Sequence, residues 1–142
     1  MIEIVNRQRK FPVDATHWEA FTGRVLSIVR TAKGQGVTVA FVSDAAIRKL
    51  NRDFRRKDKT TDVLSFPVEP EDFETGDEPT LGDIIISLAQ AARQAQANGL
   101  TLDEEIAQLI LHGVLHLLGH DHETDDGAMN RLELRLRKKL GC

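Results

Sequence analysis

Residues 112–122 read HGVLHLLGHDH and hold four of the five histidines of this 142-residue chain. Three of them, His112, His116 and His122, stand at positions i, i+4 and i+10, with Gly119 between the second and the third. Residues i and i+4 of a helix lie on one face, so two imidazoles there can reach one ion. Glycine takes the left-handed conformation without a steric penalty, so Gly119 lets the chain leave the helix and bring back the third imidazole. Three nitrogen donors and an open fourth position are typical of a catalytic zinc site rather than a structural one.

The spacing matches the zincin pattern H-E-x-x-H-x-x-G-x-x-H at each ligand and at the glycine. Gly113 stands where the zincin metallopeptidases carry the glutamate that acts as general base. This single difference favours a metal site and argues against ordinary peptide hydrolysis. His120 competes with His122 as a third ligand, but only His122 lies at the zincin offset. A core histidine with a satisfied ring is the alternative interpretation of any one of these residues.

The composition is that of one globular domain. The chain has 142 residues, of which 41% are hydrophobic and 29% charged, enough to bury a core of its own. No apolar run approaches the length of a transmembrane span, and the first residues lack the apolar region of a signal peptide. Cys142 is the only cysteine, so no internal disulfide can form, which fits a reducing compartment. We therefore expect a cytoplasmic protein without a membrane partner.

The charges are distributed unevenly, although the net charge is only −3. Residues 48–59 hold seven basic and two acidic side chains, whereas residues 69–78 hold six carboxylates and no base. A chain that is nearly neutral can still present a basic face to nucleic acid. The alternative is a solvated helix end followed by a solvated loop, and charge alone does not choose between them.

Apolar periodicity and capping residues predict a single α+β domain with α/β layers. It contains a small mixed sheet of three to four strands and about five helices. The expected strands are 2–5, 37–42, 63–66 and 84–86, and the expected helices are 14–32, 43–51, 87–98, 101–118 and 125–140. The helix over 101–118 is apolar on most sides and should be buried. It would be a zincin-like central helix that holds the metal ligands on a rigid scaffold.

Three blocks of the sequence resemble the YbeY family of bacterial rRNA maturation endoribonucleases. The family pattern has an Asn, an Arg after an aromatic, T-[DN]-V-L-S-F-P, L-G-D-I, and H-G-x-L-H-L-x-G-[YH]-D-H. The chain matches it at Asn51, at Arg55 after Phe54, and over 61–67, 81–84 and 112–122. Arg56 and Thr60 stand where the family commonly has glycine and proline. Because the match follows the chain in order and length, it implies one YbeY-like metallohydrolase domain over residues 1–142.

The resemblance implies a metal-dependent endoribonuclease specific for single strands, which acts in 16S rRNA 3′-end maturation and ribosome quality control. It makes His112, His116 and His122 the ligands of one zinc ion (Zn²⁺) per chain, and Arg55 the residue needed for activity. The implied partners are single-stranded RNA, rRNA and the small ribosomal subunit, with a small-subunit ribosomal protein and the GTPase Era. Other divalent transition metals also accept imidazole ligands.

The basic segment suits an RNA substrate. A guanidinium binds phosphate through two parallel donors and stays charged, so Arg55 can stabilise charge that develops on phosphoryl oxygens. Its alternative is a surface ion pair with Asp53 or Asp58. Four further cations are predicted to bind backbone phosphates without reading sequence, namely Arg52, Arg56, Lys57 and Lys59.

Three other residues have weaker assignments. Asp121 and Asp83 are predicted to orient the ligating rings by hydrogen bonding to them, although a strand-end carboxylate explains Asp83 equally well. Phe54 could stack on a base, but an apolar residue at a basic helix end more often belongs to the core. Gly113 offers no carboxylate, so no general base is identified. The nucleophile stays open between a water activated by the metal and the RNA 2′-OH.

Two other functions remain open. One is a zincin-like peptidase or amidase that lacks the usual glutamate base. The other is a non-catalytic, metal-stapled ribosome assembly factor, in which the ion joins the last two helices and the basic loop docks on a ribosomal particle. Metal binding would then contribute folding free energy rather than chemistry.

Overall fold

The computed structural model describes residues 1–29, 32, 34–68, 80–119 and 127–142. Over these residues the chain forms four strands and five helices, which confirms the predicted α+β fold. In chain order they are β1 (Ile2–Asn6), α1 (Ala15–Ile28), β2 (Gly36–Val42), α2 (Asp44–Arg55), β3 (Val63–Pro67), β4 (Thr80–Ser87), α3 (Leu88–Asn98), α4 (Leu102–Leu117) and α5 (Ala128–Leu140). The largest extensions beyond the predicted bounds are those of α2, which continues to Arg55, and of β4, which begins at Thr80.

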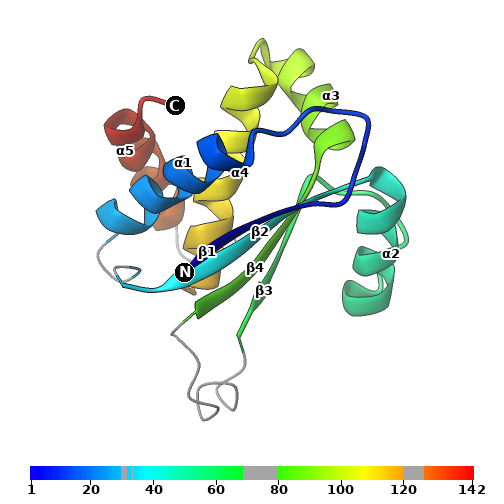
Figure 1. Ribbon diagram of the computed structural model, residues 1–142, viewed down its shortest axis with the longest axis horizontal. Coiled ribbons are helices and arrows are strands. Elements are labelled where there is room, and N and C mark those ends of the chain that lie inside the picture. The colour runs from blue at the N-terminus through cyan, green and yellow to red at the C-terminus, as the bar shows by residue number, and fades with distance from the viewer. Residues whose placement is uncertain (30–31, 33, 69–79, 120–126) are drawn as a thin grey trace.

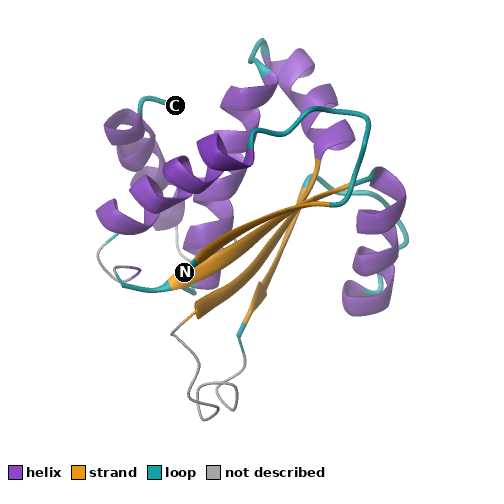
Figure 2. Ribbon diagram, viewed as in Figure 1, coloured by secondary structure: helices purple, strands orange, loops and turns teal. Residues whose placement is uncertain are grey.

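The four strands form one mixed sheet in the order β1-β2-β4-β3. β1, β2 and β4 are parallel, and β3 runs antiparallel to β4. β3 therefore forms one edge of the twisted layer that Figure 2 shows between the helices. Helices α1, α4 and α5 lie over one face of this sheet, and α2 lies against the other (Figure 1).

The alternation of side chains along the strands divides the core between the two faces. Ile84 and Ile86 of β4 belong to the larger cluster, which includes the apolar residues of α1 and α4. Ile85, between them, packs with Ile47 and Leu64 in a smaller cluster beneath α2. The continuous apolar run predicted at 84–86 thus contributes to both faces.

The helices begin where side chains cap their first free N–H groups. The Asp14 carboxylate accepts a hydrogen bond from the backbone N–H of His17, and the Ser87 hydroxyl accepts one from Gln90. Thr101 and Glu104 form the predicted capping box at the start of α4. None of the helices in the described part of the chain is long and apolar enough to cross a membrane.

Helix α4 is the buried central helix that the sequence predicts, and it approaches β4 closely at Gly113. A Cβ on Gly113 would lie 2.9–3.0 Å from three carbon atoms of the Ile84 side chain. The residue at position 113 therefore faces the sheet, and glycine suits this position because even a Cβ would force the Ile84 side chain or the helix to shift. His112 and His116 flank this contact in the sequence, so it fixes how closely the histidine-bearing turn of α4 lies against β4.

Candidate functional site

The two histidines of α4 face each other at the C-terminal end of the helix. Nε2 of His112 lies 2.8 Å from Nε2 of His116, and the two rings are inclined at 72°. This is the convergence that the i, i+4 spacing predicts. Imidazole nitrogens are common zinc ligands, so the donor chemistry of this pair fits the predicted metal.

The third predicted ligand, His122, lies outside the described residues, as does Asp121. Gly119, the last described residue before them, has a φ of +92°, the left-handed conformation expected where the chain leaves α4. Within the described residues no group of three His, Cys, Asp or Glu side chains could hold a metal ion. The three-histidine centre therefore stays a prediction. The described residues bring together two of its three nitrogens, those of His112 and His116.

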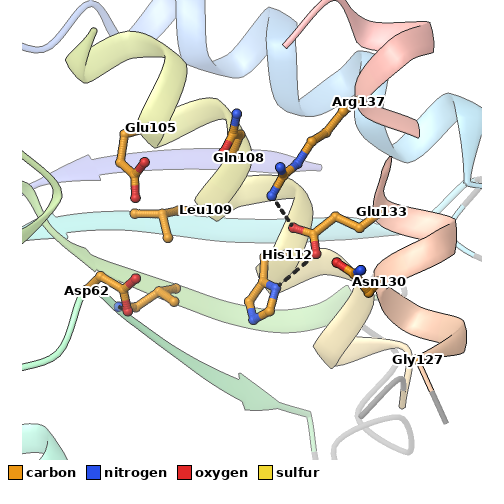
Figure 3. Close-up of a pocket in the computed structure, with 10 residues that line it drawn as sticks. Asp62, Glu105, Gln108, Leu109, His112, Gly127, Asn130, Glu133 and Arg137 are labelled. Atoms are coloured by element: carbon orange, nitrogen blue, oxygen red, sulfur yellow. Dashed lines mark hydrogen bonds and ion pairs between the residues drawn. The ribbon is translucent and has the colours of Figure 1, made fainter. Parts of the chain in front are cut away.

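Glu133 of α5 contacts the other nitrogen of His112 (Figure 3). Its Oε2 lies 3.4 Å from Nδ1 of His112, and its Oε1 accepts a hydrogen bond of 3.2 Å from Arg137. Burial tends to raise the pKa of Glu133, but its hydrogen bond with His112 and the charges of His112 and Arg137 outweigh this and lower the pKa. When Nδ1 of His112 donates to this carboxylate, Nε2 keeps a lone pair directed at His116.

Sequence reasoning missed Glu133, although the sequence contains a signal for it. Met129, Glu133, Leu136 and Leu140 follow one another at helical spacing, and all four are buried. A carboxylate within an apolar stripe is seldom buried without a partner, so its presence there predicts a specific contact.

Two further carboxylates lie in the cavity of about 430 Å³ beside His112 that Figure 3 shows. With its nitrogen turned toward them, the Gln94 amide donates to Oε1 of Glu105 at 3.0 Å and to Oδ2 of Asp62 at 2.9 Å. Burial and the nearby charge of Asp62 raise the pKa of Glu105. Gln94 therefore links the start of β3 to α4. This structural role accounts for the two carboxylates, Asp62 and Glu105, without a catalytic one.

A second cavity, of about 320 Å³, brings Arg55 to the two histidines. Its lining consists of Arg55, Asp62, Val63, Ser65, Pro67, His112 and His116. Arg55 belongs to α2, on the opposite face of the sheet from α4 (Figure 1). It reaches this cavity because β3 is an edge strand, and its Nη2 donates to the Ser65 carbonyl oxygen at 3.5 Å. We call this cavity the edge groove.

The surface ion pairs considered for Arg55 are made by other arginines. Asp53 lies 3.4 Å from Nε of Arg52, and Asp58 lies 2.9 Å from Nε of Arg48. Arg55 is thus directed toward the edge groove while both nearby carboxylates are engaged elsewhere.

The other predicted RNA-binding cations, Arg52, Arg56, Lys57 and Lys59, are exposed around the end of α2 and do not line either cavity. Asn51 holds their segment in place. Its side chain is only 3% exposed and donates from Nδ2 to the Lys59 carbonyl oxygen at 3.0 Å. Arg56 has a φ of 58°, the one positive value at a non-glycine residue in the described chain, which explains why glycine is common there in the family pattern.

Two assignments from the sequence need correction. Asp83 is not beside the histidines, because its neighbour Ile84 faces α4 and Asp83 points to the opposite side of the sheet. There burial and the charge of Glu3 raise its pKa, while a hydrogen bond from Thr38 opposes them. Phe54 is not a core residue, because its side chain is 67% exposed.

Similarity to other proteins is consistent along the whole chain. The family model described as "Endoribonuclease YbeY" matches residues 3–141. A curated protein of that name from Carboxydothermus hydrogenoformans is 42% identical over 144 residues, which cover 99% of this chain and 98% of the relative. Another, from Solibacter usitatus, is 53% identical over 110 residues, which cover 78% and 69%. The fold is similar to the solution structure of TM1509 from Thermotoga maritima, with a TM-score of 0.66 and 28% identity over 99% of this chain and 89% of that one.

Proposed function

The chain belongs to the endoribonuclease YbeY family, and from this premise we propose that it is a metal-dependent endoribonuclease that cleaves single-stranded RNA in the edge groove. The observation that supports this assignment is the cavity shared by Arg55, His112 and His116. Following the family resemblance, we further propose 16S rRNA 3′-end maturation and ribosome quality control as its cellular roles. The partners would be the small ribosomal subunit, one of its proteins and the GTPase Era, and the compartment would be the cytoplasm.

His112 and His116 would hold one zinc ion together with His122, the third ligand predicted from the sequence. When bound, zinc supplies Lewis-acid chemistry at a phosphoryl oxygen. Glu133 orients the ring of His112 by accepting from Nδ1, and Arg137 holds Glu133 in turn. Arg55 binds the phosphate with two parallel donors and stabilises the charge that develops on its oxygens.

Peptide hydrolysis is disfavoured by the same residues. Position 113 faces Ile84 rather than the groove, so the glutamate of a zincin peptidase does not fit there. A peptide substrate that pairs with an edge strand also needs the free backbone groups of that strand. Here the Ser65 carbonyl of β3 already accepts from Arg55.

The test measures cleavage of single-stranded and of duplex RNA in the presence of zinc. Four proteins are compared: wild type, His116→Ala, Arg55→Ala and Arg52→Ala. We expect cleavage of single strands that stops with a chelator, returns with zinc and is absent in His116→Ala. Arg55→Ala should keep its zinc but cleave roughly 100- to 1,000-fold more slowly, as when a preorganised donor is removed. Arg52→Ala is the comparison, since Arg52 is exposed on the same helix but does not line the groove, so its loss should weaken RNA binding and leave the cleavage rate at saturating RNA near that of wild type.

Cleavage that survives both the chelator and His116→Ala would identify a contaminating nuclease. The non-catalytic alternative makes a different prediction in cells. If Arg55→Ala complements a deletion fully while His112→Ala unfolds the protein, the metal serves as a staple and chemistry is dispensable.

A further inference from the structure

Phe54 is an exposed aromatic ring directly beside the proposed catalytic arginine. Its side chain is 67% exposed, and only Met1, Phe54 and Leu134 are large exposed hydrophobic residues in the described chain. It continues the apolar stripe of Ile47 and Leu50, which packs beneath α2 in the smaller core cluster. At the last turn of α2 the stripe ends with Phe54, which contacts the edge strand β3 but is no longer buried in the core.

Contact with β3 orients the ring but does not cover it. Phe54 and Phe66 meet edge to face, with ring centroids 5.5 Å apart and an angle of 69° between their planes. Such a contact uses at most one face of the Phe54 ring. The other face is available, in keeping with the large exposed fraction.

The ring lies on the α2 side of β3, the strand whose Ser65 and Pro67 line the edge groove. Phe66 lies between Ser65 and Pro67, which line the groove, and its side chain points to the α2 side of β3. Successive helical residues point about 100° apart, so Arg55 and Phe54 diverge to the two sides of this edge. An RNA strand whose phosphate binds Arg55 and which then crosses β3 would therefore meet the ring of Phe54.

We propose that Phe54 is a stacking site for an unpaired nucleobase of the RNA whose phosphate binds Arg55. This inference rests on the proposed function and adds to it the group that recognises single strands. The surrounding charge favours this occupant, because Arg52, Arg55, Arg56, Lys57 and Lys59 attract a polyanion while Asp53 and Asp58 pair with arginines. A base in a duplex is already stacked and paired, so only an unpaired base gains from the ring.

The experiment measures binding of the zinc-loaded full chain to a 2′-O-methyl RNA oligonucleotide by fluorescence anisotropy. Three probes of equal length are compared: a single strand, an abasic single strand and a duplex. Phe54→Ala and Phe54→Leu should each weaken binding of the single strand about 5- to 100-fold, the usual loss for one stacked base. Phe54→Tyr should bind within about twofold of wild type, because it keeps an aromatic face. The abasic strand and the duplex should bind all variants equally.

Two controls separate stacking from structural effects. Leu134→Ala removes another exposed apolar side chain, 51% exposed on α5, and should leave binding unchanged. Phe54→Leu keeps an apolar contact for Phe66 without offering a π-face. Denaturant unfolding should show that each variant is folded, with the midpoint of Phe54→Ala lowered only by the loss of its contact with Phe66.

Several outcomes overturn the inference. Unchanged binding in Phe54→Ala excludes stacking, and unchanged binding in Phe54→Leu reduces Phe54 to a generic apolar contact. Equal weakening of the abasic strand shows that Phe54 acts through the shape of α2. If wild type binds no RNA, the proposed function fails together with the inference. If wild type and Phe54→Ala bind and cleave alike, the inference alone fails.

Discussion

The His112 ring contacts a partner through each of its nitrogens. Nε2 faces His116 at 2.8 Å, and Nδ1 faces the Glu133 carboxylate at 3.4 Å. Carboxylates that bind the far nitrogen of a ligating histidine fix its tautomer and orientation and raise its basicity. Under the proposed zinc binding, the contact with Glu133 would therefore hold the His112 ring with Nε2 free to bind the cation.

Removal of the Glu133 carboxylate should weaken metal binding. We expect Glu133→Leu to bind zinc about 10- to 100-fold more weakly than wild type, because the His112 tautomer is no longer fixed. Glu133→Gln should lie between the two, since its amide oxygen can still accept from Nδ1. Competition with a chromophoric chelator measures both affinities. Arg135→Gln, an exposed charge change on α5, is the control, and equal affinity in Glu133→Leu and wild type would contradict the role of Glu133.

Arg56 occupies a backbone position that suits glycine. Its φ of 58° is strained for an L-residue, and it ends α2 with its N–H donating to the Arg52 carbonyl oxygen, while the N–H of Lys57 donates to that of Asn51. Arg56→Gly should therefore stabilise the fold by about 1 kcal/mol. Arg52→Gly makes the same change within α2 and should destabilise it by about 1 kcal/mol. Urea unfolding of both variants tests this, and the same sign for both would refute it.

At the scale of elements, the contact of α4 with β4 at Gly113 sets the position of the histidines. Gly113→Ala places a methyl group 2.9 Å from Ile84, which should cost about 1–3 kcal/mol of overpacking, partly offset by a helix propensity gain of about 1 kcal/mol. The net result is a less stable protein, measurable by chemical unfolding. Metal affinity should fall with it, because the last turns of α4 move outward.

Gly23 of α1 provides the matched comparison. A Cβ there would lie 3.5 Å from Ile2, an ordinary contact, so Gly23→Ala should be neutral or stabilising by up to about 1 kcal/mol. Ile84→Val should lessen the loss of stability caused by Gly113→Ala, because valine lacks the Cδ1 atom that crowds the new methyl group. Additive effects in the double variant would show that the strain lies elsewhere.

The local elements could be predicted because their signals are local. Caps such as Asp14, Ser87 and Thr101, and the i, i+4 pairing of His112 with His116, depend on neighbours within a few residues. The side of the sheet on which a strand residue lies depends on packing against distant helices. For that reason the sequence pattern does not determine the side on which Asp83 lies, and only the family pattern indicates that Arg55 meets the histidines. Glu133 and the exposure of Phe54 likewise depend on where α5 and β3 lie.

For the whole molecule, the position of the site at the edge of the sheet decides how it can meet RNA. The net charge is −3, so the average field of the protein repels a polyanion. The exposed cations at the end of α2 lie beside the edge groove and must supply the attraction locally. Binding should therefore depend on a few nearby charges rather than on the total charge.

Salt titration tests this local origin of the attraction. Each phosphate neutralised on single-stranded RNA contributes about −0.7 to the slope of log K against log salt. If the five cations Arg52, Arg55, Arg56, Lys57 and Lys59 all contact phosphates, the wild-type slope should be about −3.5. Lys57→Ala and Lys59→Ala should each make it shallower by about 0.7, whereas Lys10→Ala, after β1 and outside the edge groove, should leave it unchanged. Phe54→Ala should weaken binding at every salt concentration with the slope intact, because stacking releases no counterions. A change of slope in Lys10→Ala equal to that in Lys57→Ala would mean that RNA binds by diffuse charge, and the end of α2 would then have no special part in recognition.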